Sequence, residues 1–454
     1  MLVKCAIAAP AVPMVLSSLS SALCLCSHVA WSPLACIPDN CACRLHTSMA
    51  GMLPETDSED ELPAGWEERT TSDGAVYYAD HLGQRTQWTH PRTGRRKRVS
   101  PQLPFGWERG GDGTFVERAS GRRSRTDPRL AFPVEEGAPR QRFDASSTAA
   151  QVLHGCNLDG QTAVVTGASS GIGLETALAL AAHGCEVVIA CRSADSVAKT
   201  IARAQAERPG VKLTFLSLDL ASLRSVREFA AAFVQQHQHL DILILNAGVF
   251  AIPHSLTEDG FERTFQVNHL GHFYLTMLLE PLLVASAPAR VVVLASESHR
   301  FSFLSAANFS EERLSNLTGR GHYPMLVYND TKLCNMLFAA ELDRQWGPRG
   351  VHAYAVHPGN MVFSGLPRES WLYWTLFLLA RPFTKSLAQA AATTVLCATA
   401  PDLADAGGGY FNNCCQCKPS LAAQDEVLAG LLWKTSQAMV SRALLRLGSE
   451  HGVR

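Results

Sequence analysis

The sequence has almost no net charge. Its 454 residues carry 40 Lys and Arg residues against 41 Asp and Glu residues, a formal net charge of −1. This balance gives no reason to expect direct nucleic-acid binding. The sequence also lacks paired cysteines at zinc-ligand spacing, because Cys414, Cys415 and Cys417 have no second pair. We therefore expect no metal site and interpret the cysteines as reduced structural thiols.

The C-terminal half lacks an apolar run of the length that spans a bilayer. Residues 371–380 are apolar on every side, yet they reach only about half of that length. We expect this segment to cover the substrate, which favours a lipophilic substrate. Peripheral contact with a membrane surface is the alternative.

The first 48 residues differ in composition from the rest of the chain. A mostly apolar run over 5–26 is typical of a signal peptide, but two prolines interrupt it. The glycosylation sequon at Asn329 would place a glycan between two candidate catalytic residues, so secretion conflicts with catalysis. We expect no true export signal here, and translation from Met49 or Met52 is an alternative.

The length of the chain predicts two or three domains. Composition and turn signals divide it into an N-terminal extension with an acidic lead-in (1–53), two small modules (60–93 and 101–130), a polar linker (131–157), a large α/β domain (158–418) and a C-terminal helical tail (419–454).

The first small module has three short aromatic-rich strands separated by two turn signals. Thirty residues can build little core, so a few large rings must hold the sheet together. The module resembles a WW domain, which implies a structural face of Trp66, Tyr78 and Pro91. The resemblance also implies that Pro-Pro-x-Tyr proteins bind in polyproline II conformation. The ligand-binding residues would be Tyr77, His81, Gln84, Thr86 and Trp88.

The second small module is a degenerate repeat of the first. Its structural face is kept by Trp107, Phe115 and Pro128. On the binding face, the positions of Tyr77, His81 and Trp88 are taken by Thr114, Arg118 and Arg125. An arginine cannot replace an indole as a platform for proline, so we expect a supporting module without a ligand site.

Five of the seven residues from 92 to 98 are basic. Such a run is either a solvated stretch of charge or a nuclear localisation signal. The sequence does not decide between the two.

The large domain begins with a strand, a glycine turn and a helix. A β-branched run at 162–165 precedes three glycines, and an Ala/Leu-rich helix follows to residue 183. The glycines allow a tight turn and close approach of a pyrophosphate, which the helix N-terminus would bind. The expected cofactor-binding residues here are Thr166, Gly167, Ser169, Ser170, Gly171, Ile172 and Gly173. Further strands and helices alternate to residue 411, which predicts an α/β fold with a Rossmann-type doubly wound parallel sheet.

The end of the second predicted strand lacks the carboxylate that binds an NAD ribose. Arg192 stands there instead, 19 residues after Gly173, and an arginine suits a 2′-phosphate. We therefore expect NADP(H) as the cofactor. Asp219 would touch the adenine, with a helix N-cap as the alternative. Asn246, Ala247 and Gly248 end the fourth strand and would also contact the cofactor.

Four residues form the candidate catalytic group. Tyr328 and Lys332 share one helix face, and the ammonium, together with an oxidised nicotinamide, is expected to lower the pKa of the tyrosine. Ser296 ends a strand and would donate a hydrogen bond to the substrate oxygen. Asn268 stands in a helical stretch, which asparagine disfavours, and would hold a water chain that reloads the proton.

These motifs, in this order, resemble a short-chain dehydrogenase/reductase over residues 158 to about 415. Asn268-His-Leu-Gly-His-Phe273 and His357-Pro-Gly359 are similar to its retinol-dehydrogenase-like branch. The resemblance implies an oxidoreductase acting on steroid- or retinoid-like alcohols and carbonyls, with Lys332, Pro358 and Gly359 also at the cofactor.

Two WW modules beside such a domain imply a second role, as a cytoplasmic and nuclear adaptor that restrains transcription factors and promotes apoptosis. Nuclear entry would use residues 95–98, while mitochondrial or Golgi association and a homo-oligomer are alternatives. Two hypotheses result. The chain is an NADP(H)-dependent oxidoreductase that also binds Pro-Pro-x-Tyr proteins, or a non-enzymatic adaptor whose dehydrogenase fold is a cofactor-sensing scaffold.

Overall fold

The computed structural model describes residues 62–111, 113–131, 134–136, 143–207, 210–316, 318–359 and 385–451. The chain divides into two compact units, 1–61 and 62–454, and the first lies wholly outside the described residues. The predictions for the N-terminal extension with its acidic lead-in and for the apolar segment 371–380 therefore concern residues that are not described. Among the helices that are described, none combines the length and the apolar character needed to cross a membrane.

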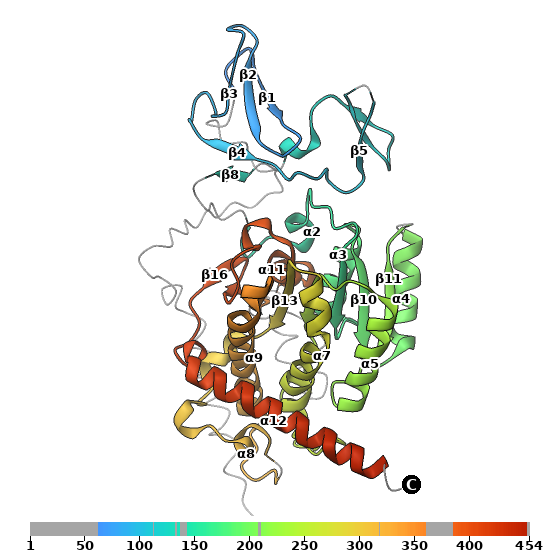
Figure 1. Cartoon of the computed structure of the whole chain (residues 1–454), viewed down its shortest axis with the longest axis vertical. Coiled ribbons are helices and arrows are strands. Elements are labelled where there is room, and N and C mark those ends of the chain that lie inside the picture. The colour runs from blue at the N-terminus through green and yellow to red at the C-terminus, as the bar shows by residue number, and fades with distance from the viewer. Residues whose placement is uncertain are drawn as a thin grey trace, which may run out of the picture. The chain divides into compact units, whose positions relative to one another are not determined.

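The first small module is an antiparallel sheet of three strands (Figure 1). The strands are β1 (Trp66–Thr70), β2 (Val76–Asp80) and β3 (Arg85–Gln87). Strand alternation buries Tyr78 completely, and Trp66 packs against the same small core, as predicted. Val99 and Leu130 lie outside the three strands but complete this core. The sheet therefore depends on residues beyond its own boundaries.

The second small module has the same strand arrangement. Its strands are β5 (Trp107–Arg109), β6 (Phe115–Glu117) and β7 (Arg123–Ser124). Trp107 pairs with Glu117, as Trp66 pairs with Asp80 in the first module. This register places Phe115 at the position of Tyr78 and confirms the alignment made from the sequence.

The basic run between the modules forms part of a two-stranded antiparallel sheet. Strand β4 (Arg96–Arg98) pairs with β8 (Val134–Glu136), and in this register Arg96 stands opposite Glu136. Lys97 lies 3.7 Å from Glu68 and is largely buried. The run is therefore part of a paired strand in which Lys97 is largely buried and the arginines are exposed. A solvated stretch of charge and a localisation signal both stay predictions.

A buried arginine joins the ends of the two small modules. Arg129 lies in a short 3-10 helix (Pro128–Ala131) and is 2% exposed. Its guanidinium binds the carboxylate of Asp127 at 2.8 Å and the hydroxyl of Thr70 at 2.9 Å. It also donates to the carbonyls of Thr71 and Ser100. The contacts satisfy a charge that would otherwise be costly to bury.

The large domain contains an eight-stranded sheet in the order β11-β10-β9-β12-β13-β14-β15-β16. Its strands are β9 (Thr162–Thr166), β10 (Glu186–Cys191), β11 (Leu213–Ser217), β12 (Ile242–Leu245), β13 (Ala289–Leu294), β14 (Val351–His357), β15 (Tyr410–Asn412) and β16 (Cys415–Cys417). All neighbours are parallel except β15 and β16. This confirms the predicted doubly wound sheet, and the strand order reverses between β9 and β12.

The hairpin strand β16 was not predicted. Its turn consists of Asn413 and Cys414, which both have positive φ. Such two-residue hairpin turns usually contain glycine, so the turn has no clear signal in the sequence.

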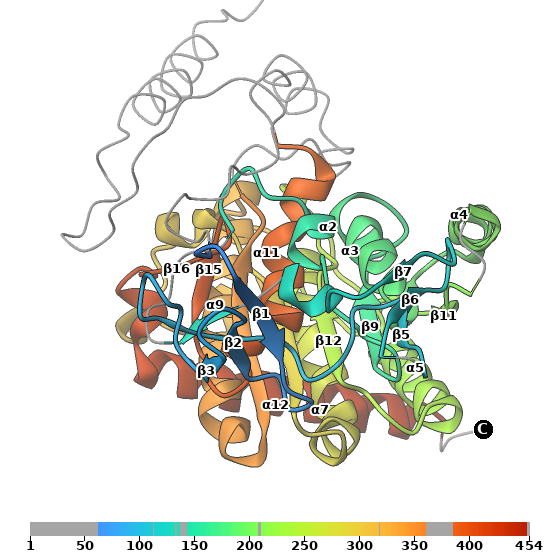
Figure 2. The ribbon, with the colours of Figure 1, turned by 90° about the horizontal axis from the view of Figure 1, so that it is seen from above.

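Helices cover both faces of the sheet and enclose two apolar cores. One face carries α2 (Ala149–Val152), α3 (Gly171–Ala181), α4 (Ala194–Glu207) and α11 (Leu387–Thr399). The other carries α5 (Leu223–Gln236), α6 (Arg263–Phe265), α7 (Gly271–Ala285), α8 (Glu311–Leu314), α9 (Pro324–Trp346) and α12 (Glu426–His451). Figure 2 shows α2, α3 and α11 on one side of β9 and β12, with α5, α7 and α12 on the other.

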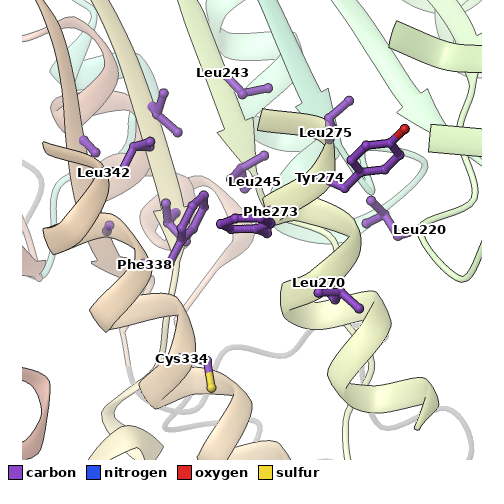
Figure 3. Close-up of a cluster of buried hydrophobic side chains, with 14 of the residues drawn as sticks. Leu220, Leu243, Leu245, Leu270, Phe273, Tyr274, Leu275, Cys334, Phe338 and Leu342 are labelled. Carbon is purple, nitrogen blue, oxygen red and sulfur yellow. The ribbon is translucent and has the colours of Figure 1, made fainter. Parts of the chain in front are cut away.

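The C-terminal helix α12 is part of the apolar core on the face of the sheet that carries α5, α7 and α9. Trp433 of α12 packs against Phe273 of α7 and Phe338 of α9, with ring centroids 5.2 and 5.9 Å apart. Figure 3 shows Phe273 and Phe338 pointing toward each other beneath the strand residues Leu243 and Leu245. The predicted helical tail is therefore built into the domain.

Candidate functional site

The glycine turn connects β9 to α3 as predicted. Gly167 has a φ of +66°, which strongly favours glycine. A side chain at Gly173 would meet the amide of Asn246 at 2.3 Å, so helix and strand can approach only around glycine. Within the described residues, the side chain of the N-cap Ser170 does not cap α3. The first amides of the helix can therefore bind an anion, with the help of its dipole.

A cleft of about 510 Å³ opens above the glycine turn, at the carboxyl ends of the parallel strands. The predicted residues that line it are Gly167, Ser169, Ser170, Gly171, Ile172, Gly173, Arg192, Asp219, Asn246, Ala247, Gly248, Tyr328, Lys332 and Pro358. The strand order reverses here, which is where open α/β sheets bind their ligands.

Thr166 does not contact the cleft, so its prediction as a cofactor contact is wrong. Its side chain is fully buried. Its hydroxyl accepts hydrogen bonds from the amides of Asn246 at 2.9 Å and Ala247 at 3.0 Å. It also lies 2.9 Å from Nε2 of His272. Thr166 therefore organises the strand ends beneath the cleft.

The two residues predicted to recognise the adenosine end both line the cleft. Arg192 follows β10 and is exposed. Asp219 follows β11 and accepts a hydrogen bond from the amide of Ala221. The N-cap of α5 is Ser222, whose hydroxyl accepts from the amide of Ser225. The alternative that Asp219 is a helix N-cap is therefore wrong.

Tyr328 and Lys332 lie on the first turns of α9 and are 7% and 5% exposed. Lys332 Nζ donates to the carbonyl of Leu294 at 2.9 Å and lies 5.5 Å from the centre of the Tyr328 ring. Burial lowers the pKa of Lys332 to about 8. Burial also raises the pKa of Tyr328 to about 12, and a hydrogen bond with Ser296 offsets this only in part. In the folded chain, burial therefore dominates the pKa of Tyr328. A lower pKa when an oxidised nicotinamide is bound stays a prediction.

Ser296 follows β13 and lies beside Tyr328. Its hydroxyl accepts a hydrogen bond from the amide of Ser298 at 3.2 Å, which orients it at the start of a 3-10 helix (Glu297–Phe301). Its carbonyl lies 2.7 Å from Nδ1 of His299. The hydroxyl groups of Ser296 and Tyr328 are therefore brought together by a hydrogen bond, and Tyr328 lines the cleft.

Asn268 lies in a π-helical turn (Gln266–Leu270) between α6 and α7. π-Turns occur often at functional sites, and this one explains an asparagine in a helical stretch. Its side chain donates to the carbonyl of Val249 at 3.0 Å and to the hydroxyl of Thr331 at 3.1 Å. It accepts from the amide of Val249 at 2.8 Å. Both amide hydrogens of Asn268 are therefore used inside the protein, so a water could be held only through its oxygens.

Pro358 and Gly359 follow β14. Pro358 lines the cleft. Gly359 has a φ of +104°, and a side chain there would meet Lys385 at 2.7 Å. Gly359 therefore allows a left-handed turn and the close approach of Lys385 immediately before the segment 360–384, which is not described.

Several polar and aromatic neighbours of the site were not predicted. The ring of Phe250 lies edge-on to Tyr328 at 4.8 Å. Asn335 donates to the carbonyl of Leu294, the same oxygen that holds Lys332. Asn335 could have been found, because a buried asparagine in a helix needs a reason. Phe250 carries no such signal.

The first small module brings its predicted ligand-binding rings together. Tyr77 and Trp88 lie 5.9 Å apart at an interplanar angle of 64°, and Trp88 is 52% exposed. His81 is exposed and hydrogen-bonds to Glu67 at 2.8 Å. Gln84 in the β2–β3 loop and Thr86 on β3 are also exposed.

Among the residues described, no cluster of three or more His, Cys, Asp or Glu could hold a metal ion.

Comparisons with known proteins agree with this arrangement. The family described as "short chain dehydrogenase" matches residues 161–310, and the WW domain matches residues 62–91. A protein from Drosophila melanogaster named WW domain-containing oxidoreductase is 51% identical over 86% of this chain and 97% of its own length. A Homo sapiens protein of the same name is 52% identical over 88% of this chain and 98% of its own length.

More distant relatives match only the large domain. Retinol dehydrogenase 12 of Mus musculus is 41% identical over 62% of this chain and 86% of its own length. The crystal structure of an uncharacterized protein from Mycobacterium paratuberculosis is 30% identical, with a TM-score of 0.50, and covers 65% of this chain and 98% of its own.

Proposed function

Because the chain belongs to the family of WW domain-containing oxidoreductases, we propose that it transfers a hydride between NADP(H) and a lipophilic alcohol or carbonyl compound. The family makes it an oxidoreductase with a short-chain dehydrogenase domain that uses a nicotinamide cofactor. The choice of NADP(H) and the substrate class are our proposal. The observation that carries it is one cleft lined by a glycine turn, Arg192, Tyr328 and Lys332.

Three features of the cleft support a dinucleotide whose adenosine end carries a 2′-phosphate. Gly167 and Gly173 let the turn pack against Ala247 and Asn246, and the α3 N-terminus offers amides to a pyrophosphate. Arg192 and Asp219 both line the cleft, and an arginine suits a 2′-phosphate.

The side chains at the other end of the cleft support proton transfer. When bound, the cofactor supplies or accepts the hydride. With a pKa of about 12, Tyr328 is protonated at neutral pH and can donate its proton to a substrate oxygen as negative charge develops there. Ser296 would hydrogen-bond to the same oxygen. Lys332, with a pKa of about 8, is mostly protonated at pH 7 and places a positive charge beside the ring of Tyr328.

The wall around Tyr328 favours an apolar substrate. Phe250 and Ile252 line the cleft, and the ring of Phe250 contacts that of Tyr328. Aromatic and aliphatic walls with few polar groups are typical of sites for lipophilic ligands. The likeness to proteins named retinol dehydrogenase supports the same substrate class.

Turnover of a panel of steroids and retinoids by the full-length chain tests this function. With NADPH or NADP⁺ we expect turnover of at least one compound. Tyr328→Phe should abolish turnover and leave NADPH affinity nearly intact, because only the proton is lost. Lys332→Ala should weaken both, because its ammonium is expected at the nicotinamide ribose. Appreciable turnover by Tyr328→Phe would refute the mechanism.

A second candidate function is supported by the first small module. Tyr77 and Trp88 form an exposed aromatic pair of the kind that grips a polyproline II ligand. We propose that this pair binds Pro-Pro-x-Tyr proteins, so that the chain combines an adaptor with an enzyme. If no panel compound is turned over but such a peptide binds, the adaptor with a cofactor-sensing scaffold is the better description.

A further inference from the structure

A buried histidine connects the glycine turn to the π-helical turn, and neither the relatives' names nor the catalytic group accounts for it. His272 lies on the first turn of α7 and is 1% exposed. Its Nε2 lies 2.9 Å from the hydroxyl of Thr166, and its Nδ1 lies 3.2 Å from the carbonyl oxygen of Asn268. Thr166 ends β9 immediately before the glycine turn, so one imidazole ring joins the cofactor side of the cleft to Asn268.

The hydrogen bonds determine which nitrogen carries the proton. The carbonyl oxygen of Asn268 can only accept, so Nδ1 of His272 must be the donor. The hydroxyl of Thr166 already accepts two hydrogen bonds, from the amides of Asn246 and Ala247. It therefore has only its own proton left to give, and Nε2 of His272 is a closer acceptor than the carbonyl of Ile244 at 3.3 Å. All donors and acceptors are satisfied by the Nδ1–H tautomer alone.

We propose that His272 is a positioning residue that holds the backbone carbonyl of Asn268 and couples it to the glycine turn through Thr166. This inference rests on the proposed function, because it concerns how the cofactor side of the cleft reaches the catalytic side. Cofactor binding at the glycine turn reduces the motion of the end of β9. Through the two hydrogen bonds of the His272 ring, it also reduces the motion of the π-helical turn that carries Asn268.

The surroundings keep His272 neutral, as this link requires. Burial lowers the pKa of His272 to about 4, with a smaller contribution from the charge of Lys332, although the hydrogen bond to the carbonyl of Asn268 raises the pKa in part. Protonation would remove the acceptor at Nε2 and break the contact with Thr166. Asn268 also donates a hydrogen bond to the hydroxyl of Thr331, the residue before Lys332 on α9. A side-chain carbon placed on Gly248 would be 3.3 Å from Oδ1 of Asn268 and 3.9 Å from Nζ of Lys332. A shift of Asn268 would therefore be felt at the catalytic lysine.

Two near-isosteric substitutions separate the two bonds of the ring. In His272→Asn the side-chain amide nitrogen takes the place of Nδ1. The hydrogen bond to the carbonyl of Asn268 is therefore kept, and the contact with Thr166 is lost. In His272→Gln a polar atom remains near Nε2, while the donor to the carbonyl is lost. Thr276→Val is the matched control, because Thr276 is buried on the same helix and its hydroxyl bonds only to the carbonyl of His272 among the hydrogen bonds described. It removes a buried hydroxyl from the same helix and leaves both bonds of the His272 ring in place.

Hydrogen–deuterium exchange of the full-length chain, with and without NADPH, measures the coupling between the glycine turn and the π-helical turn. The measurement does not require a substrate. In the wild type and in Thr276→Val, NADPH should slow exchange both at residues 167–173 and at residues 266–272. In both His272 variants it should slow exchange at 167–173 only. Protection of 266–272 that survives in His272→Gln and His272→Asn, or that is lost equally in Thr276→Val, would overturn the proposal.

Kinetics then separate a positioning role from a structural one. His272→Gln should lose roughly 10- to 100-fold in kcat with little change in KM, because a small misplacement near the reacting groups is costly. His272→Asn should retain kcat within about threefold, since it keeps the hold on the carbonyl. Equal kcat losses in the two variants would contradict the assignment.

A third measurement is independent of cofactor and substrate. Nitrogen-15 NMR of the histidine-labelled full-length chain without NADPH should show His272 as the neutral Nδ1–H tautomer, and the Nε2–H tautomer would overturn the proposal. If the wild type does not bind NADPH at all, the proposed function fails, and the tautomer alone decides whether His272 holds Asn268.

Discussion

A second buried histidine, His269, makes the stability of the large domain depend on pH, and this dependence can be measured. His269 lies in the π-helical turn, where its Nε2 is 3.0 Å from the hydroxyl of Ser436 on α12. The rings of Phe265 and Phe338 lie 5.5 and 5.7 Å from it. Complete burial lowers the pKa of His269 from 6.5 to about 3. The folded chain therefore keeps this histidine neutral where the unfolded chain protonates it.

The direction of the effect is set by proton binding. Between pH 6.5 and about 3 the unfolded state binds a proton at His269 and the folded state does not. Stability therefore falls as the pH falls through this window. At pH 5.0 the loss from this one group, relative to pH 7.5, is about 2 kcal/mol.

The double variant His269→Phe/Ser436→Ala removes the titrating group together with the Ser436 hydroxyl that contacts it. Asn335, which also hydrogen-bonds to His269, keeps its bond to the carbonyl of Leu294. Urea unfolding of the wild type and of the double variant is compared at pH 7.5 and pH 5.0. The wild type should lose about 2 kcal/mol more than the variant between the two pH values. His272 is present in both proteins, so the effect of its own burial is common to the two, while its charge also lowers the pKa of His269. Equal losses would show that His269 titrates normally, and the reasoning from its burial would be wrong.

Three other predictions concern separate parts of the chain. Arg192→Ala should weaken NADPH binding by about 1.5–3 kcal/mol and leave NADH binding unchanged, as measured by fluorescence titration. Equal loss for both nucleotides would remove the assignment to NADP(H). Trp88→Ala should weaken binding of a Pro-Pro-x-Tyr peptide by at least about 2 kcal/mol in calorimetry, while Arg125→Ala in the second module changes it little. Binding that survives the loss of Trp88 would place the ligand site elsewhere. Arg129→Met should destabilise the small modules by about 3–5 kcal/mol in thermal or urea unfolding, because it leaves the buried carboxylate of Asp127 without its partner. A change below 1 kcal/mol would mean that this ion pair is solvated.

Local patterns allowed much of the large domain to be predicted. Strand, glycine turn and helix follow from residues close together in the sequence, so the turn at 167–173 and the Tyr328–Lys332 pair were found where the structure has them. The mismatch between Asn268 and a helix interior marked it as a candidate site residue, and the structure accounts for the mismatch with a π-helical turn that the sequence did not predict.

Long-range contacts could not be predicted in the same way. Thr166 belongs to the glycine motif, but its role depends on amides about 80 positions later in the chain. The pKa of Tyr328 depends on how completely the domain buries the ring, which no spacing reveals. Val99 and Leu130 complete the core of the first small module from outside its strands, and no repeat or turn signal marks them.

The position of α12 and of the β15–β16 hairpin has a consequence for how the chain is made. Both are translated after every other strand and helix described in the large domain, yet Trp433 packs directly on Phe273 and Phe338. During synthesis the nascent domain therefore exposes this aromatic surface until residues 410–443 have emerged from the ribosome. The first small module, by contrast, has its last core residue at 130 and can close early. On the ribosome, the chain would present a finished module for a long interval before the cleft is complete, and a chaperone that binds exposed aromatic surface would act on it in that interval.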